Sequence, residues 1–264
     1  MTIGFIGLGN MATAMIGGIL KQGDVTKDNI IGADVFFDAV LKAEETFGIR
    51  GMNSNVAVAQ NSDILVLSVK PQFYESVIAE IKDVIRESQI IITIAPGKTI
   101  AWLTGQFGRE CKIVRCMPNT PALVGEGCTG VCKSDLVTEA EMERVLHILS
   151  SFGIASVVSE NLMDVVVGVS GSSPAYVFMF IEAMADAAVA EGMPRKTAYE
   201  LAAQAVLGSA KMVLETGKHP GELKDMVCSP AGTTIQAVKT LEAKGMRSAV
   251  MEAVQVCIEK SRSL

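Results

Sequence analysis

The chain of 264 residues has few of the side chains on which many metal and hydrolase sites depend. It contains only two histidines, His147 and His219, so a zinc site or a histidine-centred hydrolase is not expected. Its six cysteines form no C-x-x-C pair and are predicted to be reduced thiols. We therefore expect no metal and a cytoplasmic location.

Basic runs are also missing, and 23 Lys and Arg against 29 Asp and Glu give a net charge of −6. A mildly acidic chain without a basic cluster is a poor binder of nucleic acid or of anionic membranes. The first twenty residues carry no charged side chain, but five of them are glycine and no basic residue precedes Lys21. This pattern argues against both a signal peptide and a membrane-spanning helix.

The first part of the chain alternates between predicted strands and helices. Short apolar strands are expected at 2–6, 29–33, 64–69, 89–94 and 112–117, with a last weak strand at 155–158. Amphipathic stretches lie between them, and Thr138–Glu141 is a capping box that opens another helix. Strands that alternate with helices form parallel sheets. We therefore predict a doubly wound parallel α/β sheet of the Rossmann type over residues 1–158.

From about residue 160 onward, the sequence shows no convincing strand. Ala, Met, Val, Leu and Glu recur at helical spacing, interrupted by short segments that contain Gly or Pro. Residues 159–264 are predicted to form an all-helical second domain. This segment is so apolar that a single copy should not be able to bury all of its hydrophobic surface. We therefore expect an obligate oligomer built on a dimer.

A glycine-rich turn follows the first predicted strand. The pattern Gly7-x-Gly9-x-x-Ala12 between a strand and a helix is typical of dinucleotide-binding proteins. Gly7 permits the tight turn, Gly9 lets a pyrophosphate approach the backbone, and the helix N-terminus favours negative charge. A plain glycine turn is the alternative.

Asp34 ends the second predicted strand, where an acidic residue accepts hydrogen bonds from the ribose hydroxyls of NAD. No Arg or Lys occurs between Asp34 and Val40 to attract the 2′-phosphate of NADP. Asp34 therefore favours NADH, and the alternative is a solvated loop carboxylate.

Three further polar segments follow predicted strands, and ligands of open α/β sheets bind at these strand ends. An ordinary loop is the alternative interpretation of the segments at Ser68–Pro71 and Ala95–Gly97. A stiff turn is the alternative for the segment that contains Asn119. The predicted cofactor contacts here are Ser68, Val69, Lys70, Pro71, Ala95, Pro96, Gly97 and Asn119.

Two segments of the second domain are predicted to start helices, Ser170–Tyr176 and Ser229–Thr234. Hydroxyls, small residues and proline make a strong cap at the first, which needs no ligand. At the second, free backbone N–H groups suit a small carboxylate, and Thr234 adds a hydroxyl.

Taken together, these motifs resemble the pyrroline-5-carboxylate reductase family. The resemblance spans nearly the whole chain in order, and its last three motifs are specific in combination. It rests on Gly7–Ala12, Val69–Pro71, Arg115–Pro121, Ser170–Tyr176 and Ser229–Thr234.

The resemblance implies an NAD(P)H-dependent oxidoreductase that acts on an imine. The reaction is reduction of 1-pyrroline-5-carboxylate to L-proline, the last step of proline biosynthesis, an amino-acid biosynthesis pathway. The implied assembly is an intertwined homodimer, often built further into a decamer. The implied phosphate loop is Ile6, Gly7, Leu8, Gly9, Asn10 and Met11. On the adenosine side, Asp34 and Asn55 would contact the cofactor. The implied substrate loop is Ala231, Gly232, Thr233 and Thr234.

For the chemistry, we assign the substrate carboxylate to the N–H groups of Gly232 and Thr233. The Thr234 hydroxyl is the candidate catalytic partner, or proton donor, for the ring nitrogen.

The chain departs from the family pattern at two positions. Ser173 and Ala231 each stand where the family usually has glycine, and both changes are small. Another imine or hydroxyacid reductase of the same architecture is the first alternative. β-Hydroxyacid dehydrogenases use a lysine on the first long helix of the second domain, and 174–191 contains none. A nucleotide-binding regulator without turnover is the second alternative.

Overall fold

The computed structural model describes residues 1–263 and contains two compact units. The first unit comprises Met1–Ser172 with the C-terminal segment that starts at Cys257, and the second comprises Ser173–Val256. The domain boundary that the sequence predicts after residue 158 stays a prediction, since compactness alone does not define where a functional domain ends.

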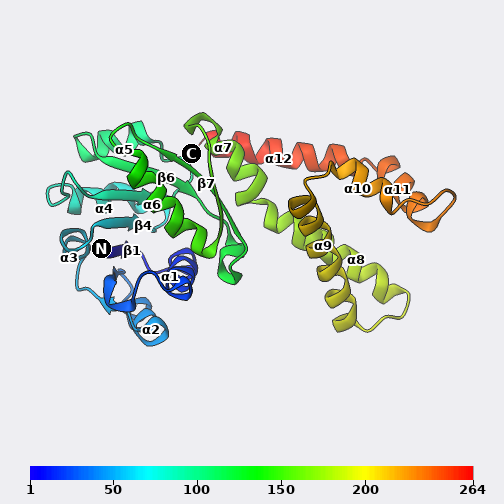
Figure 1. Cartoon of the computed structure of the whole chain (residues 1–264), viewed down its shortest axis with the longest axis horizontal. Coiled ribbons are helices and arrows are strands. Elements are labelled where there is room, and N and C mark those ends of the chain that lie inside the picture. The colour runs from blue at the N-terminus through cyan, green and yellow to red at the C-terminus, as the bar shows by residue number, and fades with distance from the viewer. Residues whose placement is uncertain (264) are drawn as a thin grey trace. The chain divides into compact units, whose positions relative to one another are not determined.

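The first unit is built on an eight-stranded sheet with the strand order β3-β2-β1-β4-β5-β6-β7-β8 (Figure 1). Its central strands are short and fully buried, as expected for parallel strands that are covered on both faces. The strands are β1 Ile3–Ile6, β2 Ile30–Ala33, β3 Arg50–Gly51, β4 Ile64–Leu67, β5 Ile90–Thr93, β6 Lys112–Met117, β7 Gly127–Lys133 and β8 Gly153–Val157.

Two of these strands, β3 and β7, are absent from the sequence-based prediction. β7 runs antiparallel to β6, with Arg115 opposite Cys132, whereas the other strand pairs are parallel. The sheet is thus mostly parallel rather than entirely so. The sequence of β7, Gly-Cys-Thr-Gly-Val-Cys-Lys, lacks the continuous apolar run that marks the other buried strands.

Helices cover both faces of the sheet. One hydrophobic cluster joins a face of the sheet to α1, α2 and α6, and a second joins the opposite face to α3, α4 and α5. The bounds are α1 Asn10–Gln22, α2 Phe37–Phe47, α3 Asn55–Asn61, α4 Tyr74–Ile81, α5 Ile100–Phe107 and α6 Glu139–Leu149.

The capping box predicted at Thr138 is confirmed at the start of α6. The backbone N–H of Glu141 donates to Thr138 Oγ1 (3.3 Å), and the Thr138 N–H donates to Glu141 Oε2 (3.0 Å). Ser54 and Thr99 cap α3 and α5 by the same kind of side-chain acceptor. These three helices therefore begin with a backbone N–H already satisfied.

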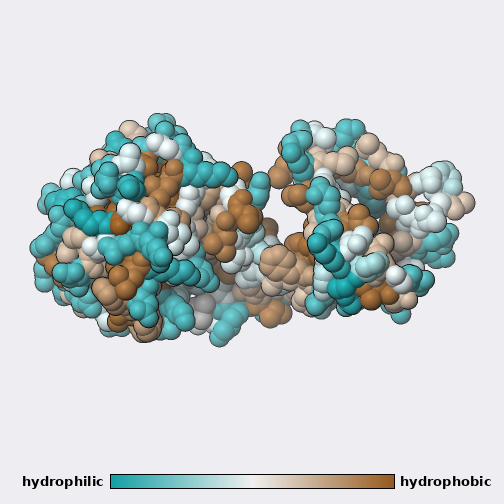
Figure 2. Space-filling model, turned by 90° about the horizontal axis from the view of Figure 1, so that it is seen from below, coloured by the Kyte–Doolittle hydropathy of each residue, from teal (hydrophilic) through white to brown (hydrophobic). Residues whose placement is uncertain are grey.

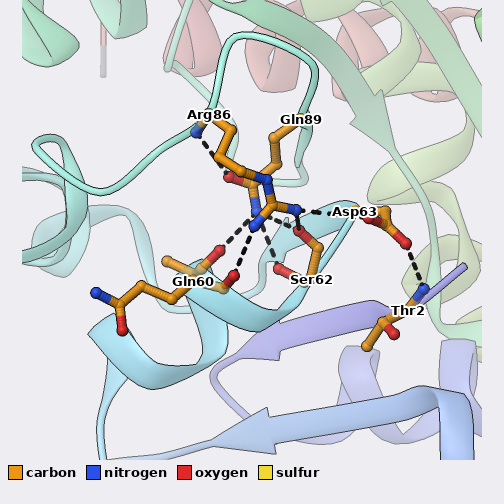
Figure 3. Close-up of polar contacts among 7 residues, drawn as sticks. Thr2, Gln60, Ser62, Asp63, Arg86 and Gln89 are labelled. Carbon is orange, nitrogen blue, oxygen red and sulfur yellow. Dashed lines mark hydrogen bonds and ion pairs between the residues drawn. The ribbon is translucent and has the colours of Figure 1, made fainter.

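Near the start of β4 and β5, polar side chains satisfy the backbone (Figure 3). Arg86 donates to the carbonyl oxygens of Gln60 (2.6 Å) and Ser62 (2.7 Å), at the end of α3. The buried Gln89 amide donates to the carbonyls of Ala59 (2.8 Å) and Ser62 (2.7 Å). Carbonyls at a helix end lack intrahelical partners. These contacts therefore satisfy the carbonyls at the end of α3, next to the starts of β4 and β5.

A buried cation lies within the sheet. Arg115 on β6 is 2% exposed, and its Nη1 lies 3.2 Å from Glu160 Oε1. The same carboxylate oxygen accepts the backbone N–H of Ile100 at the start of α5 (2.7 Å). Glu160 therefore compensates the buried charge and orients a helix at once.

Three cysteines lie in the interior of the first unit. Cys111, Cys116 and Cys132 are buried, and all six cysteines are free thiols. Burial raises the pKa of the Cys132 thiol to about 11 and raises that of Cys116 further. These groups are therefore neutral thiols at physiological pH.

The second unit contains only helices among its described residues. Its buried apolar side chains are all alanine, namely Ala185, Ala198 and Ala202. Hydrophobic residues are visible at its surface in Figure 2. The helices are α8 Ser173–Ala190, α9 Arg195–Thr216, α10 Pro220–Met226, α11 Thr233–Ala243 and α12 Met246–Arg262, the last of which ends in the first unit.

One helical stretch of the chain, Glu160–Ala190, is long and apolar enough to cross a membrane by length and composition alone. Only 6% of its most apolar window is buried.

The prediction that Ser170–Tyr176 starts a long helix is confirmed, since α8 begins at Ser173 within this segment, although other helical turns precede it. A short helix, α7 Met163–Val166, is followed by a π-helical turn, Val167–Gly171, in which the Ser172 N–H donates to Val167 O (2.8 Å). Pro174 then falls in the first turn of α8, where its missing N–H costs little. The hydroxyl and proline pattern of a cap thus also fits the end of a π turn.

Candidate active site

The carboxyl ends of β1, β2 and β4 form the centre of the candidate cofactor site. β1 pairs with β2 on one side and with β4 on the other, so the strand order reverses direction there. Ligands of open α/β sheets bind at this switch point. Ile6, Ala33 and Leu67 are the last residues of the three strands.

The turn after β1 depends on Gly7. Its φ is +94°, and a Cβ there would lie 2.9 Å from the backbone carbonyl carbon of Ser68. The Gly7 N–H donates to Ala33 O (2.8 Å), and the Ser68 hydroxyl donates to Gly7 O (2.7 Å). Only glycine fits this position, which fixes the path of the chain into α1.

The start of α1 forms an open cradle. Gly9 is its N-cap, with no side-chain cap and no acidic residue in the first turn. Nothing lies within 4 Å of the position that a Gly9 Cβ would occupy. The first intrahelical bond is Thr13 N–H to Gly9 O, so Asn10, Met11 and Ala12 have N–H groups without intrahelical acceptors. These features fit the pyrophosphate of a dinucleotide.

Asp34 holds the glycine turn from the end of β2. Its Oδ2 accepts the N–H of Leu8 (2.7 Å), and its Oδ1 accepts the N–H of Phe36 (2.9 Å). Asp34 is thus not the freely solvated carboxylate of the alternative interpretation. It fixes two loops and keeps a negative charge beside the turn.

A cavity of about 360 Å³ adjoins Asp34. Its walls are mostly apolar and include Phe36 and Phe73, which are 74% and 51% exposed. Asn55 also lines it and donates to Glu80 Oε2 (2.7 Å). Two carboxylates and no Lys or Arg occur among the described residues that line the cavity.

Ser68–Pro71 lies at the end of β4, as predicted. Val69 lines the cavity, Lys70 is exposed, and Pro71 begins a short 3-10 helix, Pro71–Phe73. Ser68 contacts the glycine turn rather than facing solvent. Of this segment, Ser68 and Val69 lie closest to the predicted cofactor cradle.

Tyr74 joins the ends of β4 and β5. Its buried hydroxyl donates to Leu67 O (2.6 Å) and accepts from Thr93 Oγ1 (3.0 Å) and the Ile94 N–H (3.3 Å). Burial raises the pKa of Tyr74 to about 12. The neutral hydroxyl therefore fixes the approach to Ala95, Pro96 and Gly97, of which Gly97 has a φ of +74°.

Asn119 is buried at the end of β6, and both ends of its amide have partners. Its Nδ2 donates to Ser170 O (3.0 Å), and its Oδ1 accepts the N–H of Cys128 (2.8 Å). In this arrangement Asn119 joins the Pro118–Pro121 loop to β7 and to the π turn. A direct cofactor contact from Asn119 stays a prediction.

In the second unit, Ala231–Thr234 forms the start of α11. Gly232 is the N-cap, again without a side-chain cap and without an acidic residue in the first turn. The Gly232 N–H donates to Ser229 O (3.0 Å) and is therefore engaged, unlike our expectation that it binds the substrate carboxylate. Thr233 and Thr234 occupy the first two helical positions, whose N–H groups have no intrahelical acceptor.

Sequence reasoning missed Phe36, Phe73, Glu80 and Tyr74. The signal for Phe36 was present, since three apolar residues, Val35–Phe37, follow Asp34 directly. Phe73 and Glu80 carried no local signal, because only the fold brings the segment before α4 and the end of α4 to this cavity. Among residues 1–263, no cluster of three or more His, Cys, Asp or Glu side chains is placed to hold a metal.

Comparison with known proteins covers the whole chain. Residues 160–264 match the family described as pyrroline-5-carboxylate reductase dimerisation, and residues 2–97 match NADP oxidoreductase coenzyme F420-dependent. The pyrroline-5-carboxylate reductase of Escherichia coli K12 is 53% identical over 99% of this chain and 97% of its own. That of Methanosarcina acetivorans is 47% identical with the same coverage.

Solved structures agree with this result. The pyrroline carboxylate reductase of Plasmodium falciparum with NADP bound is 35% identical and superposes with a TM-score of 0.90, over 99% of this chain and 97% of that one. The Coxiella burnetii enzyme is 34% identical with a TM-score of 0.92 and the same coverage. The chain belongs to the pyrroline-5-carboxylate reductase family.

Proposed function

We propose that this protein reduces the C=N bond of 1-pyrroline-5-carboxylate with NAD(P)H to give L-proline, the last step of proline biosynthesis. The observation that carries the proposal is the 53% identity to a named reductase across 99% of the chain. The glycine cradle at α1 supports it, because it is open and uncapped where a dinucleotide would bind.

The residues of the chain bind and orient the reactants. The N–H groups at the start of α1 hold the cofactor pyrophosphate, and Asp34 faces the adenosine ribose. The bound nicotinamide supplies the hydride for the imine carbon. Thr233 and Thr234 offer N–H groups to the substrate carboxylate, and the Thr234 hydroxyl holds the ring nitrogen.

The defining experiment follows the absorbance of NADH and NADPH while 1-pyrroline-5-carboxylate is added. Cofactor oxidation that depends on the imine, with L-proline as the product, is expected. Cofactor binding without imine-dependent oxidation would contradict the proposal and favour a nucleotide-binding regulator.

Thr234→Ala tests the role of the hydroxyl. We expect a lower kcat/KM for the imine with nearly unchanged NADH binding, because one neutral hydrogen bond is worth about 0.5–1.5 kcal/mol. Thr234→Ser, which keeps the hydroxyl, should recover most of the loss. An unchanged kcat/KM in Thr234→Ala would remove this residue from the mechanism.

We further propose that NADH is used better than NADPH. Asp34 and Glu80 place two carboxylates at the cavity, and no Lys or Arg among the described residues lines it. A 2′-phosphate there would meet like charge, whereas ribose hydroxyls can donate to Asp34. Charged hydrogen bonds contribute about 1.5–3 kcal/mol, which corresponds to roughly 10- to 100-fold in favour of NADH.

Steady-state kinetics with both cofactors test this preference. Asp34→Ser and Asp34→Asn should both lower the ratio of kcat/KM for NADH to that for NADPH. Asparagine removes the charge but keeps an oxygen that accepts one of the N–H groups of Leu8 and Phe36. It therefore separates the effect of the charge on cofactor choice from the effect of loop order. Glu80→Gln removes the second cavity carboxylate without touching the glycine turn, so it should also lower this ratio. A wild-type preference for NADPH would overturn the proposal.

The two exposed phenylalanines at the cavity suggest how the adenine ring is held. Phe36 and Phe73 both line the cavity, and stacking on an aromatic side chain stabilises a base by about 1–3 kcal/mol. Phe36→Ala should raise KM for NADH but not for reduced nicotinamide mononucleotide, which lacks adenosine. Phe37→Ala is the matched control, because Phe37 is 69% exposed but does not line the cavity.

The apolar stretch Glu160–Ala190 is proposed to pack against a second copy rather than against lipid. The dimerisation family match begins at residue 160 and includes the whole stretch. We propose a cytoplasmic homodimer that is assembled further into a decamer. Light scattering measures the assembly, and recovery of the protein with membranes in the absence of detergent would contradict it.

A further inference from the structure

Ala231 has an unusual backbone conformation. Among the described residues it is the one residue other than glycine with a positive φ, at 59°. Left-handed conformations are disfavoured for residues with a Cβ, by roughly 5- to 30-fold in population. Gly7, Gly97 and Gly217 show that the chain otherwise places glycine where φ is positive.

The neighbouring residues explain why the chain turns left-handed at this point. The Gly232 N–H donates to Ser229 O (3.0 Å), which closes a four-residue turn with Pro230 and Ala231 at its centre. Proline at the second position and a positive φ at the third are the features of a type II turn, which favours glycine at the third position. Ala231 therefore adopts its conformation against its own preference.

The next residue, Gly232, differs from Ala231, because a side chain there is opposed by lack of space and not by backbone conformation. A Cβ at Gly232 would lie 2.3 Å from Ser229 Oγ, although its φ of −74° suits any residue. Crowding by Ser229, whose Oγ and O would lie 2.3 Å and 3.1 Å from a Cβ, favours glycine at position 232, whereas conformation would favour glycine at position 231. The chain meets the first requirement and not the second.

The turn sets the direction of the proposed substrate contacts. Gly232 follows the turn as the extended N-cap of α11, and Thr233 and Thr234 are the next two residues. If Ala231 leaves the left-handed region, the bond between Gly232 and Ser229 opens. The free N–H groups and the Thr234 hydroxyl then change direction together.

We infer that Ala231 is a positioning residue that weakens substrate binding through its backbone. Only molecules with the type II turn bind the imine carboxylate, and alanine populates this turn less than glycine would. The apparent affinity is reduced by the fraction of competent molecules. The inference rests on the proposed function, because it concerns the proposed substrate turn.

A series of substitutions at position 231 separates backbone conformation from side-chain bulk. Ala231→Gly should lower KM for the imine about 3- to 10-fold and leave KM for NADH unchanged. Ala231→Asn should also lower it, though less, because asparagine tolerates the left-handed region despite its size. Ala231→Val should raise it, and the glycine and asparagine variants suffice if the valine variant does not fold.

Inhibition by L-proline gives a reading that does not depend on the rate of the chemical step. The inhibition constant of L-proline against the imine should follow the same order as KM: Gly lowest, then Asn, then Ala. Ala237→Gly is the control, since Ala237 is exposed within α11 and its substitution weakens the helix without touching the turn. Its KM values should equal those of the wild type.

The outcomes separate the inference from the proposed function. If the wild-type protein does not oxidise NADH with the imine, the proposed function fails. If it does, and KM for the imine is the same in Ala231→Gly and wild type, the inference is overturned. A KM that rises in Ala231→Asn while falling in Ala231→Gly would overturn it too, because bulk rather than conformation would then decide.

Discussion

The two compact units differ in what lies inside them. The first unit buries large side chains in three hydrophobic clusters on both faces of its sheet. The second unit buries only three alanines among its described apolar residues, while Phe178, Met179 and Leu214 are 62%, 68% and 74% exposed. A helical unit without large buried side chains has little hydrophobic stabilisation of its own. The first unit therefore has a core that one copy can supply, whereas the apolar surface of the second is what the proposed homodimer would cover.

The largest expected effect comes from placing a charge on the exposed apolar surface of α8. Phe178→Glu should weaken dimerisation by roughly 3 kcal/mol or more, over 100-fold, because the charge would be desolvated at the interface. Light scattering across a dilution series measures the dissociation, and activity should fall with it. Gln204→Glu, on the exposed surface of α9, adds the same single negative charge and controls for the change of charge. A stable dimer of Phe178→Glu would show that this surface stays uncovered.

The stability of the first unit should instead depend on contacts within a single copy. Glu160→Ala leaves Arg115 buried without its carboxylate and should lower the free energy of unfolding by about 3 kcal/mol. Guanidinium unfolding measures this loss, which should not depend on protein concentration. Glu139→Ala should change stability much less, because its ion pair with Lys133 is 84% exposed on the glutamate side. Equal losses in the two variants would contradict the difference between the buried and exposed pairs.

Alkaline pH should destabilise the first unit through Tyr74. Its pKa is raised from 10.0 to about 12 in the folded protein, so between these values the unfolded state loses its proton first. Stability is then constant below about pH 10 and falls by about 2 kcal/mol by pH 12. In Tyr74→Phe this part of the pH dependence should disappear. Urea unfolding of both proteins between pH 9 and 12 compares the slopes, and parallel curves would exclude Tyr74 as the cause.

The smallest effect is expected at the capping box of α6. Thr138→Ala removes the acceptor for the Glu141 N–H and should cost about 1 kcal/mol. Thr138→Ser keeps the oxygen and should recover most of the loss in a thermal unfolding experiment. Activity should not change in either variant, because α6 lines neither candidate site. A larger loss for serine than for alanine would show that packing rather than capping matters here.

The sequence predicted the features that depend on local pattern. Apolar runs located the central strands, the glycine pattern located the turn before α1, and the Thr138 box located α6. β7 escaped notice because its two glycines and two cysteines do not form an apolar run. The helix start within Ser170–Tyr176 was located correctly, but the π turn that precedes it was not expected.

The location of the candidate site at the strand ends could be predicted from the sequence, but most of its side-chain contacts could not. Asp34 was found from its place after β2, yet its bond to Leu8 depends on how two loops fold together. The bond between the Gly232 N–H and Ser229 O is different, because it closes a local turn that Pro230 at the second position could have indicated. The conformation of Ala231 could have been suspected from the same proline, since the position after it normally needs glycine in such a turn.

The buried thiols allow the opening of the first unit to be timed. Alkylating reagents react with thiolates, and Cys116 and Cys132 are both inaccessible and neutral while the sheet is intact. Their labelling rate at neutral pH therefore reports how often the interior opens, whereas Cys228, in the second unit, is only partly buried. Mass spectrometry of the labelled peptides would resolve the two units within one sample, without an introduced probe. The natural cysteines thus make this protein its own reporter of local unfolding.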